Sequence, residues 1–446
     1  MASKSRVIAI ITEGATPQLL DRWTAEGRLP NFARLLTEGT RGDLVADGVP
    51  YEPPGLVSLL TGQPPGEHGV FSYWSCHTPE YRPRVENGES SRHPLLWRLP
   101  DLKGVRFASV GLFGTHPPAP MDGWVVSYPM QLTLRACYPP GLHRELAGHG
   151  IAPTHDTAIW WHGQAKESFV PDVLEADRRR GAAALLLYGK GADVVLVNLT
   201  SIDRLSHIYW QELELGPEHT ADSAVFAAYQ TADRVIGDAL DRADEQTTVL
   251  AFSEIGFGPL RSYCAVNDDL ADAGLLVRNT DGAGNTTVDW SATTAFEAVQ
   301  GTHGVNINLR GRYQQGTVAP QDYHKVRADV AEQLAAVINP RTGRPMFAAV
   351  SPSEEIYQGA AVTEAPDLIL EPADWRYLPL GDQTWAKKVH RTWQSAWHRR
   401  ESYWALAGPA TARANAVAAP VDITATLVHL LGRDVPATLP GKPLTA

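Results

Sequence analysis

The sequence has few cysteines and no long apolar run. Its 446 residues include three cysteines, Cys76, Cys137 and Cys264, which lie far apart without Cys-x-x-Cys spacing. This excludes a disulfide framework or a zinc ribbon and favours a reducing compartment. No segment approaches 18 consecutive apolar residues, so we expect no membrane span. The apolar run at 6–12 is typical of a first strand and not of a signal peptide, so we expect a cytoplasmic protein.

The chain also has no surplus of basic residues. Its net charge is −11, with the acids spread along the sequence, which argues against nucleic acid or an anionic membrane as the main partner. There is no Gly-x-Gly-x-x-Gly after a strand and no Walker-type loop, so nothing indicates a nucleotide cofactor. Apolar residues make up 43% of the chain, which is ample for a core. We therefore expect a globular protein that acts on a small molecule.

Short apolar runs alternate with helical patterns along the chain. This alternation predicts an α/β fold with a doubly wound, mostly parallel sheet and helices on both faces. The pattern loosens in the middle, so we expect a core formed by 1–257 and 391–446 with an inserted cap at 258–390. The expected strands are 6–12, 105–112, 193–200, 247–253 and, more weakly, 365–370 and 402–408; the expected helices are 16–27, 221–244, 323–338 and 421–432.

Acidic residues follow three of the expected strands. Glu13, Asp203 and Glu254 each come within a few residues of a strand end, and the carboxyl ends of parallel strands meet at one edge of a sheet. His207 follows Asp203 by four positions, which places both side chains on one face of a helix. Carboxylates crowded at one edge repel one another unless a cation neutralises them, so this pattern favours a divalent metal ion.

The order of several motifs resembles the type I phosphodiesterase/nucleotide pyrophosphatase family of the alkaline phosphatase superfamily. The likeness covers nearly the whole chain: VIAIITEGATPQLLDRW, PYEPPGLVSLLTGQPPGEHGVF, SIDRLSHIYW, SEIGFGPL and SAWHRRESYWALAGP. The resemblance implies an alkaline-phosphatase-like fold and two metal ions, usually zinc. It assigns one metal site to Asp203, His207 and His398, with His390 as the alternative to His398 on sequence alone.

The other half of the family site is altered at every position. The first-strand aspartate of the family is Glu13, and its Asp-His pair is Glu254 and Ile255. The position of the Thr or Ser nucleophile is occupied by Glu52, so no covalent phospho-enzyme is expected. Glu52 could instead be a further metal ligand or a general base that activates a metal-bound water.

Three hypotheses follow for the function. The first is a hydrolase that acts on a phosphoester, phosphodiester or related ester by metal-activated water. The second is a repurposed dinuclear carboxylate/histidine centre with non-hydrolytic chemistry, which includes oxidation. Iron or manganese would suit its carboxylate-rich ligands, and zinc would suit the histidine-containing half. The third is a catalytically silent binding protein. We also expect room for a homodimer and a substrate pocket that includes Trp160, Trp161, His162, Trp210 and His116.

Overall fold

Two compact units make up the chain. A computed structural model describes residues 5–130, 133, 135–153, 160–216, 222–280, 286–379, 381, 394–409 and 416–445. Unit 1 comprises 1–64, 87–258 and 395–446, and unit 2 comprises 65–86 and 259–394. Each unit has its own buried apolar core.

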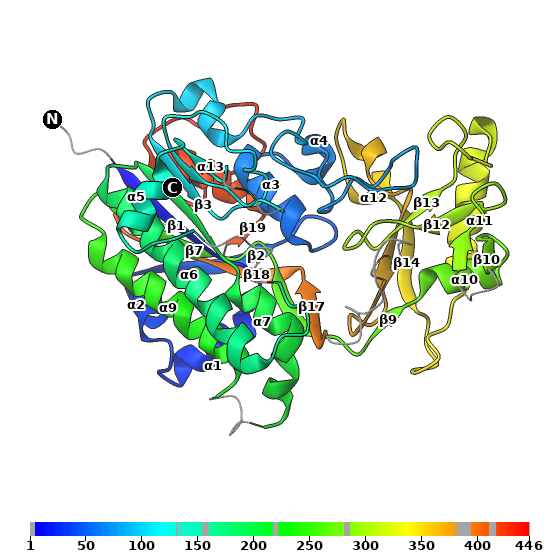
Figure 1. The fold of residues 1–446 in the computed structure, drawn as a ribbon, viewed down its shortest axis with the longest axis horizontal. Coiled ribbons are helices and arrows are strands. Elements are labelled where there is room, and N and C mark those ends of the chain that lie inside the picture. The colour runs from blue at the N-terminus through cyan, green and yellow to red at the C-terminus, as the bar shows by residue number, and fades with distance from the viewer. Residues whose placement is uncertain are drawn as a thin grey trace. The chain divides into compact units, whose positions relative to one another are not determined.

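Unit 1 is built on a nine-stranded sheet in the order β19-β2-β18-β7-β1-β6-β3-β4-β5 (Figure 1). β1 runs parallel to β6 and β7, and β3 runs parallel to β6 and β4, which confirms the mostly parallel sheet. The expected strand at 402–408 is present as β18, but it is antiparallel to β2 and β7. The strands are β1 Arg6–Thr12, β2 Gly39–Val45, β3 Phe107–Val110, β4 Gly123–Val126, β5 Cys137–Tyr138, β6 Val194–Leu199, β7 Thr247–Phe252, β18 Glu401–Ala407 and β19 Val417–Ala418.

Helices cover both faces of this sheet, as a doubly wound fold requires. Figure 1 shows α6 and α9 on one side and α3 and α13 on the other. Side chains of alternate residues in β1 point to opposite faces of the sheet, and those of Ile8 and Ile10 belong to the core under α6 and α9. The helices are α1 Pro17–Ala25, α2 Pro30–Glu38, α3 Glu52–Thr61, α5 Leu142–Gly148, α6 Lys166–Gly189, α7 Ser201–Tyr209, α9 Ala224–Arg242 and α13 Pro420–Leu430.

Unit 2 contains a four-stranded sheet in the order β12-β13-β15-β14. The strand expected at 365–370 lies here as β15, within the expected cap, but it pairs antiparallel with β13 and β14 and not in a parallel sheet. The elements are α4 Pro65–His68, β9 Ser262–Cys264, α10 Val266–Asp272, β10 Arg278–Thr280, β11 Thr286–Val288, β12 Ala295–Glu297, β13 Gly304–Ile307, α11 Tyr323–Ala335, β14 Phe347–Pro352, α12 Ser353–Ile356, β15 Leu368–Pro372 and β16 Tyr377–Pro379.

The segment 65–86 belongs to unit 2, although the sequence pattern placed it in the core with the rest of 1–257. It hydrogen-bonds to residues more than 200 positions further along the chain. The side-chain amide of Asn306 donates to the carbonyl of Cys76, and the backbone N–H of Gln314 donates to the carbonyl of Pro79. Because these bonds join distant segments, a reading of contiguous patterns could not detect them.

None of the helices within the described ranges combines the length and the apolar character that a bilayer span requires.

Candidate metal centre

Three adjacent strands of unit 1 direct acidic residues to one edge of the sheet. Glu13 follows β1 directly, Asp203 lies in the first turn of α7 after β6, and Glu254 lies two residues after β7. The backbone N–H of Asp203 donates to the carbonyl of Glu13 at 3.0 Å, which fixes the start of α7 against the end of β1. The sheet therefore delivers the carboxylates to one region, as the strand-end pattern predicted.

Four side chains form a compact group of potential metal ligands: Glu52, Asp203, His207 and His398. One nitrogen or oxygen atom from each lies within 4.8 Å of the corresponding atoms of the others. The Nε2 atoms of His398 and His207 lie 3.0 and 3.4 Å from the same oxygen, Oδ1 of Asp203. On its other side, Nδ1 of His398 lies 3.7 Å from Oε2 of Glu52.

The histidines are held in place by the strand β17, Ala396–Arg399, which pairs with β8, Gly256–Pro259. Nδ1 of His207 lies 3.1 Å from the carbonyl of Ala396, and the N–H of Ser395 donates to the carbonyl of His207 at 2.6 Å. If Nδ1–H of His207 donates to the carbonyl of Ala396, the unprotonated nitrogen is Nε2, and its lone pair faces Asp203. Such an outer hydrogen bond commonly fixes the tautomer of a metal-binding histidine.

The spacing of these atoms suits a single ion. Ligands at about 2.0 Å from a tetrahedral zinc ion lie about 3.3 Å from one another, and the two imidazole–carboxylate distances bracket this value. Two imidazoles and one carboxylate leave a fourth position for water, substrate or Glu52. The donors of Asp203, His207 and His398 therefore fit zinc or another first-row divalent ion.

The burial of the carboxylates also favours a cation. Glu13, Glu52, Asp203 and Glu254 are all at most 5% exposed. Both carboxylate oxygens of Glu254 and Oε2 of Glu52 have no hydrogen-bond partner among the described residues. Buried charges without partners are unfavourable, so these acids must either take up protons or share a positive ion.

The directions of the pKa shifts also show that burial disfavours the charged form of these acids. Burial, followed by the negative charge of Asp203, raises the pKa of Glu13 and of Glu52 well above the ordinary value, and burial raises the pKa of Glu254 to about 8. Burial lowers the pKa of His398 to about 4. Burial opposes ionisation of Asp203 too, but His207 and His398 outweigh it and lower its pKa. Without an ion, Asp203 is thus the acid that the site keeps ionised.

Glu13 and Glu254 lie outside the compact group of four. Glu13 accepts a hydrogen bond of 2.6 Å from the side-chain amide of Asn198 in β6, a contact that the sequence did not suggest. Glu254 packs against α3, where a Cβ added at Gly55 would come within 2.7 Å of its Cγ. Ile255 is fully buried, and its aliphatic side chain offers no ligand.

Aromatic rings surround both histidines. The ring centroid of Phe257 lies 4.8 Å from that of His207 and 5.0 Å from that of His398, and Trp397 lies 4.6 and 4.7 Å from the same two rings. Tyr51 lies 5.6 Å from His398. Of these rings, the sequence singled out none, because nothing in a linear pattern brings β8, β17 and the start of α3 together. The low polarity around the histidines strengthens electrostatic interactions within the group.

The residues expected in a substrate pocket have different surroundings, and their contact with a substrate stays a prediction. Trp210 is buried and packs with Phe257 and Ala396 beside the metal group. Trp161 packs on the main core of unit 1, and its Nε1 donates to the carbonyl of Gln164. The carbonyl of Trp160 accepts a hydrogen bond from the side-chain amide of Gln164, and His162 is exposed. Nδ1 of His116 lies 3.1 Å from Oγ of Ser127. His390, the alternative to His398 as a metal ligand, falls outside the described residues.

The architecture matches that of several solved hydrolases. Phosphonoacetate hydrolase from Sinorhizobium meliloti 1021 is 15% identical, with 96% of each chain covered and a TM-score of 0.63. Wild-type alkaline phosphatase PafA is 15% identical, with 100% of this chain and 99% of that chain covered and a TM-score of 0.60. Human ectonucleotide pyrophosphatase/phosphodiesterase 5 is 11% identical, with 99% of each chain covered and a TM-score of 0.56. The fold is thus alkaline-phosphatase-like.

A comparison with protein-family models identifies the family. The model of type I phosphodiesterase/nucleotide pyrophosphatase matches residues 7–402, which is most of the chain. No curated protein sequence matches this chain. The chain belongs to the type I phosphodiesterase/nucleotide pyrophosphatase family, a family of metal-dependent phosphoester hydrolases.

Proposed function

We propose that the chain hydrolyses a small phosphoester, phosphodiester or related ester, using a divalent ion held by Asp203, His207 and His398 and Glu52 as the general base. The observation that carries the proposal is the convergence of two Nε2 atoms on one Asp203 oxygen, at 3.0 and 3.4 Å, with a glutamate carboxylate beside them. When bound, the ion supplies Lewis acidity that polarises an ester oxygen and acidifies a water molecule.

Glu52 is well placed to move the proton. It is the first residue of α3, and its side chain is 7% exposed, so its carboxylate is held at the ligand group and largely out of bulk water. Its raised pKa, caused by burial and by the charge of Asp203, makes it a stronger base than a solvated carboxylate. In this role Glu52 accepts the proton of the attacking water, and the ester bond is cleaved without a covalent enzyme intermediate.

The first turn of α3 has few backbone N–H groups that could bind the phosphoryl group of a substrate. Pro53 and Pro54 follow Glu52, so two positions of the first turn carry no N–H that could bind a phosphoryl oxygen. Arg204 and Arg399 are fixed positive charges nearby. The charge of Arg204 partly offsets the rise in the pKa of Glu13, and its guanidinium donates to the hydroxyl of Tyr128 at 3.1 Å, whereas the charge of Arg399 acts on His398.

A second candidate function is a closed metal-binding protein without hydrolytic activity. It is favoured by the fact that Glu52 offers its ligand atom within 4.8 Å of the other three. If Glu52 binds the ion, four protein ligands complete a tetrahedral shell, as in structural zinc sites, and no position is left for water.

The substitution Glu52→Gln separates the two functions. We expect the wild-type protein loaded with zinc or manganese to release 4-nitrophenol from bis(4-nitrophenyl) phosphate or 4-nitrophenyl phosphate. With Glu52 as the base, Glu52→Gln lowers kcat by about 10²–10⁴-fold and leaves the metal content unchanged. A variant that loses the ion, or that hydrolyses as fast as the wild type, contradicts the proposed role.

Glu52→Thr is the matched variant, because it restores a hydroxyl at the position of the family's nucleophile. A burst of 4-nitrophenol at the start of the diester reaction would show that a covalent step has returned. An inactive wild type that binds the ion tightly would support the closed metal-binding protein instead.

A further inference from the structure

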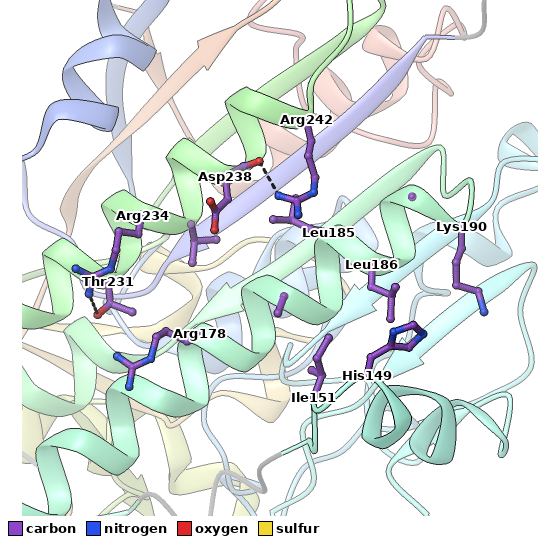
Figure 2. Close-up of a pocket in the computed structure, with 13 residues that line it drawn as sticks. His149, Ile151, Arg178, Leu185, Leu186, Lys190, Thr231, Arg234, Asp238 and Arg242 are labelled. Atoms are coloured by element: carbon purple, nitrogen blue, oxygen red, sulfur yellow. Dashed lines mark hydrogen bonds between the residues drawn. The ribbon is translucent and has the colours of Figure 1, made fainter.

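A groove in unit 1 lies apart from the metal centre, on the outer side of the helical layer (Figure 2). It has a volume of about 730 Å³ and runs between α6 and α9, with His149 and Ile151 after α5 at one end. α6 ends just before β6 begins, so its last turn lies toward the amino end of that strand, whereas the candidate ligands follow the carboxyl ends. The groove is therefore not part of the site described above.

The floor of the groove is apolar. Leu185 and Val235 are nearly buried, and Leu186 and Ile151 are half-buried, with the exposed methyl group of Ala182 between the helices. The lining residues run from 178 to 189 on α6 and from 231 to 242 on α9. At a rise of about 1.5 Å per residue, each stretch is about 16 Å long, or three helical turns.

The rim of the groove is positively charged on a protein whose net charge is −11. Its lining contains four cations and a single carboxylate, that of Asp238, and all five of these side chains are exposed. The cations are Arg178, Lys190, Arg234 and Arg242.

Two of these cations make no ion pair in the described part of the chain, although the charge of Arg234 acts on the carboxylate of Asp233. Arg178 pairs with Glu175 at 2.9 Å and Lys190 pairs with Glu145. Figure 2 shows Arg234 donating to the hydroxyl of Thr231 and Arg242 donating to a backbone carbonyl, and across the described ranges neither reaches a carboxylate. Both guanidinium groups can therefore pair with an incoming acid.

We propose that this groove binds an amphipathic helix of a partner protein that carries acidic residues beside its apolar stripe. An apolar floor three turns long with an open rim fits the helix-in-groove mode, in which residues at i, i+3, i+4 and i+7 supply the anchors. Arg234 and Arg242 are eight positions apart on α9, so acids seven or eight positions apart on the partner would meet both.

Other occupants fit less well. In a symmetric dimer of this chain the patch would face a copy of itself, and a rim with four cations and one carboxylate would meet the same surplus of positive charge, which is repulsive. Small-ligand pockets bury 70–90% of their ligand, and a groove whose rim side chains are all exposed does not enclose one in this way.

The test uses the full-length protein and a fluorescein-labelled 18-residue helical peptide with a leucine stripe flanked by glutamates seven positions apart. We expect saturable binding by fluorescence anisotropy that weakens with salt. Arg234→Glu combined with Arg242→Glu should weaken it by about tenfold or more, whereas Arg341→Glu with Arg344→Glu, an equal charge change in unit 2, should not.

Four results would overturn the proposal. The first three are equal binding of a scrambled peptide of the same composition, equal weakening by the two double variants, and failure of the peptide to bind where dodecanoate binds the wild type and not the Arg234→Glu/Arg242→Glu protein. Self-association of the chain that the same groove variant abolishes would also overturn it, because the occupant would be a second copy. Circular dichroism of each variant confirms that it is folded.

Discussion

Asp203 is the side chain on which the candidate centre is organised. Its Oδ1 lies between two imidazole Nε2 atoms, and its charge is felt by Glu13, Glu52 and Glu254, all of which have raised pKa values. The i, i+4 spacing to His207 and the strand-end rule brought these residues to attention in the sequence. The contact of Asn198 with Glu13 could not be predicted in this way, because an amide in the middle of an apolar strand carries no spacing signal.

Glu254 gives a prediction for the metal-free protein. Its pKa in the folded chain is about 8, whereas an unfolded glutamate titrates near 4.5, so the folded state holds a proton that the unfolded state releases between these values. The free energy of unfolding should therefore fall as the pH rises from about 5 to 8, by an amount on the order of a few kcal/mol. Glu254→Gln, which cannot ionise, should reduce this dependence, with the remainder coming from Glu13 and Glu52, and should be the more stable protein at pH 9.

The measurement is urea unfolding in the presence of a chelator at pH 6 and pH 9. Glu332→Gln, an exposed glutamate on α11, serves as the control and should follow the wild type. The same loss of stability at pH 9 in Glu254→Gln and in the wild type would show that Glu254 does not ionise in the folded protein as inferred.

At the scale of the elements, the turn between β1 and α1 brings the first acid to its place. Gly14 has φ = +86°, and a Cβ there would lie 2.9 Å from the Phe257 ring and 3.0 Å from Cα of Asp203. Its N–H donates to Oγ of Ser253 at 3.0 Å, which links the ends of β1 and β7. The absence of a side chain at Gly14 thus lets β1, α7 and β8 approach one another behind the ligands.

Gly14→Ala should be more damaging than Gly27→Ala. Both positions have a positive φ, +86° and +71°, so both alanines pay about 1 kcal/mol for the left-handed conformation. A Cβ at Gly27 meets nothing within 4 Å, whereas at Gly14 it strikes the Asp203 backbone and the Phe257 ring. We expect Gly14→Ala to lose roughly 1–3 kcal/mol more in thermal or urea unfolding and to bind zinc more weakly. Equal losses would mean that the close approach at Gly14 is not required.

The elements also show where sequence patterns stop being informative. The strands 6–12, 193–200 and 247–253 were predicted to within a residue or two, because each is a short apolar run buried on both faces. The 24-residue helix α6 was not predicted: Pro171 lies in its second turn, and consecutive arginines at 178–180 interrupt the apolar spacing. The antiparallel direction of β18 was missed too, since a fully buried run has no alternation that marks its orientation.

At the scale of the whole molecule, the family could be identified from the order of motifs, and its model matches residues 7–402. The position of residues 65–86 in unit 2 could not be predicted from the sequence, since it depends on hydrogen bonds to segments far along the chain. The resemblance to the family also implies that Glu13, Glu52, Glu254 and Ile255 replace other residues of the family's site. We therefore expect the number of ions and the reaction to be properties of this chain.

The most direct test of the account is the metal content per chain, measured by elemental analysis of protein purified without chelators or metal-affinity resin. We predict about one divalent ion per chain in the wild type. In Asp203→Asn we predict its loss, because that substitution removes the carboxylate shared by both histidines. A wild type without an ion, or an Asp203→Asn protein that retains it fully, would contradict the assignment of the centre to Asp203, His207 and His398.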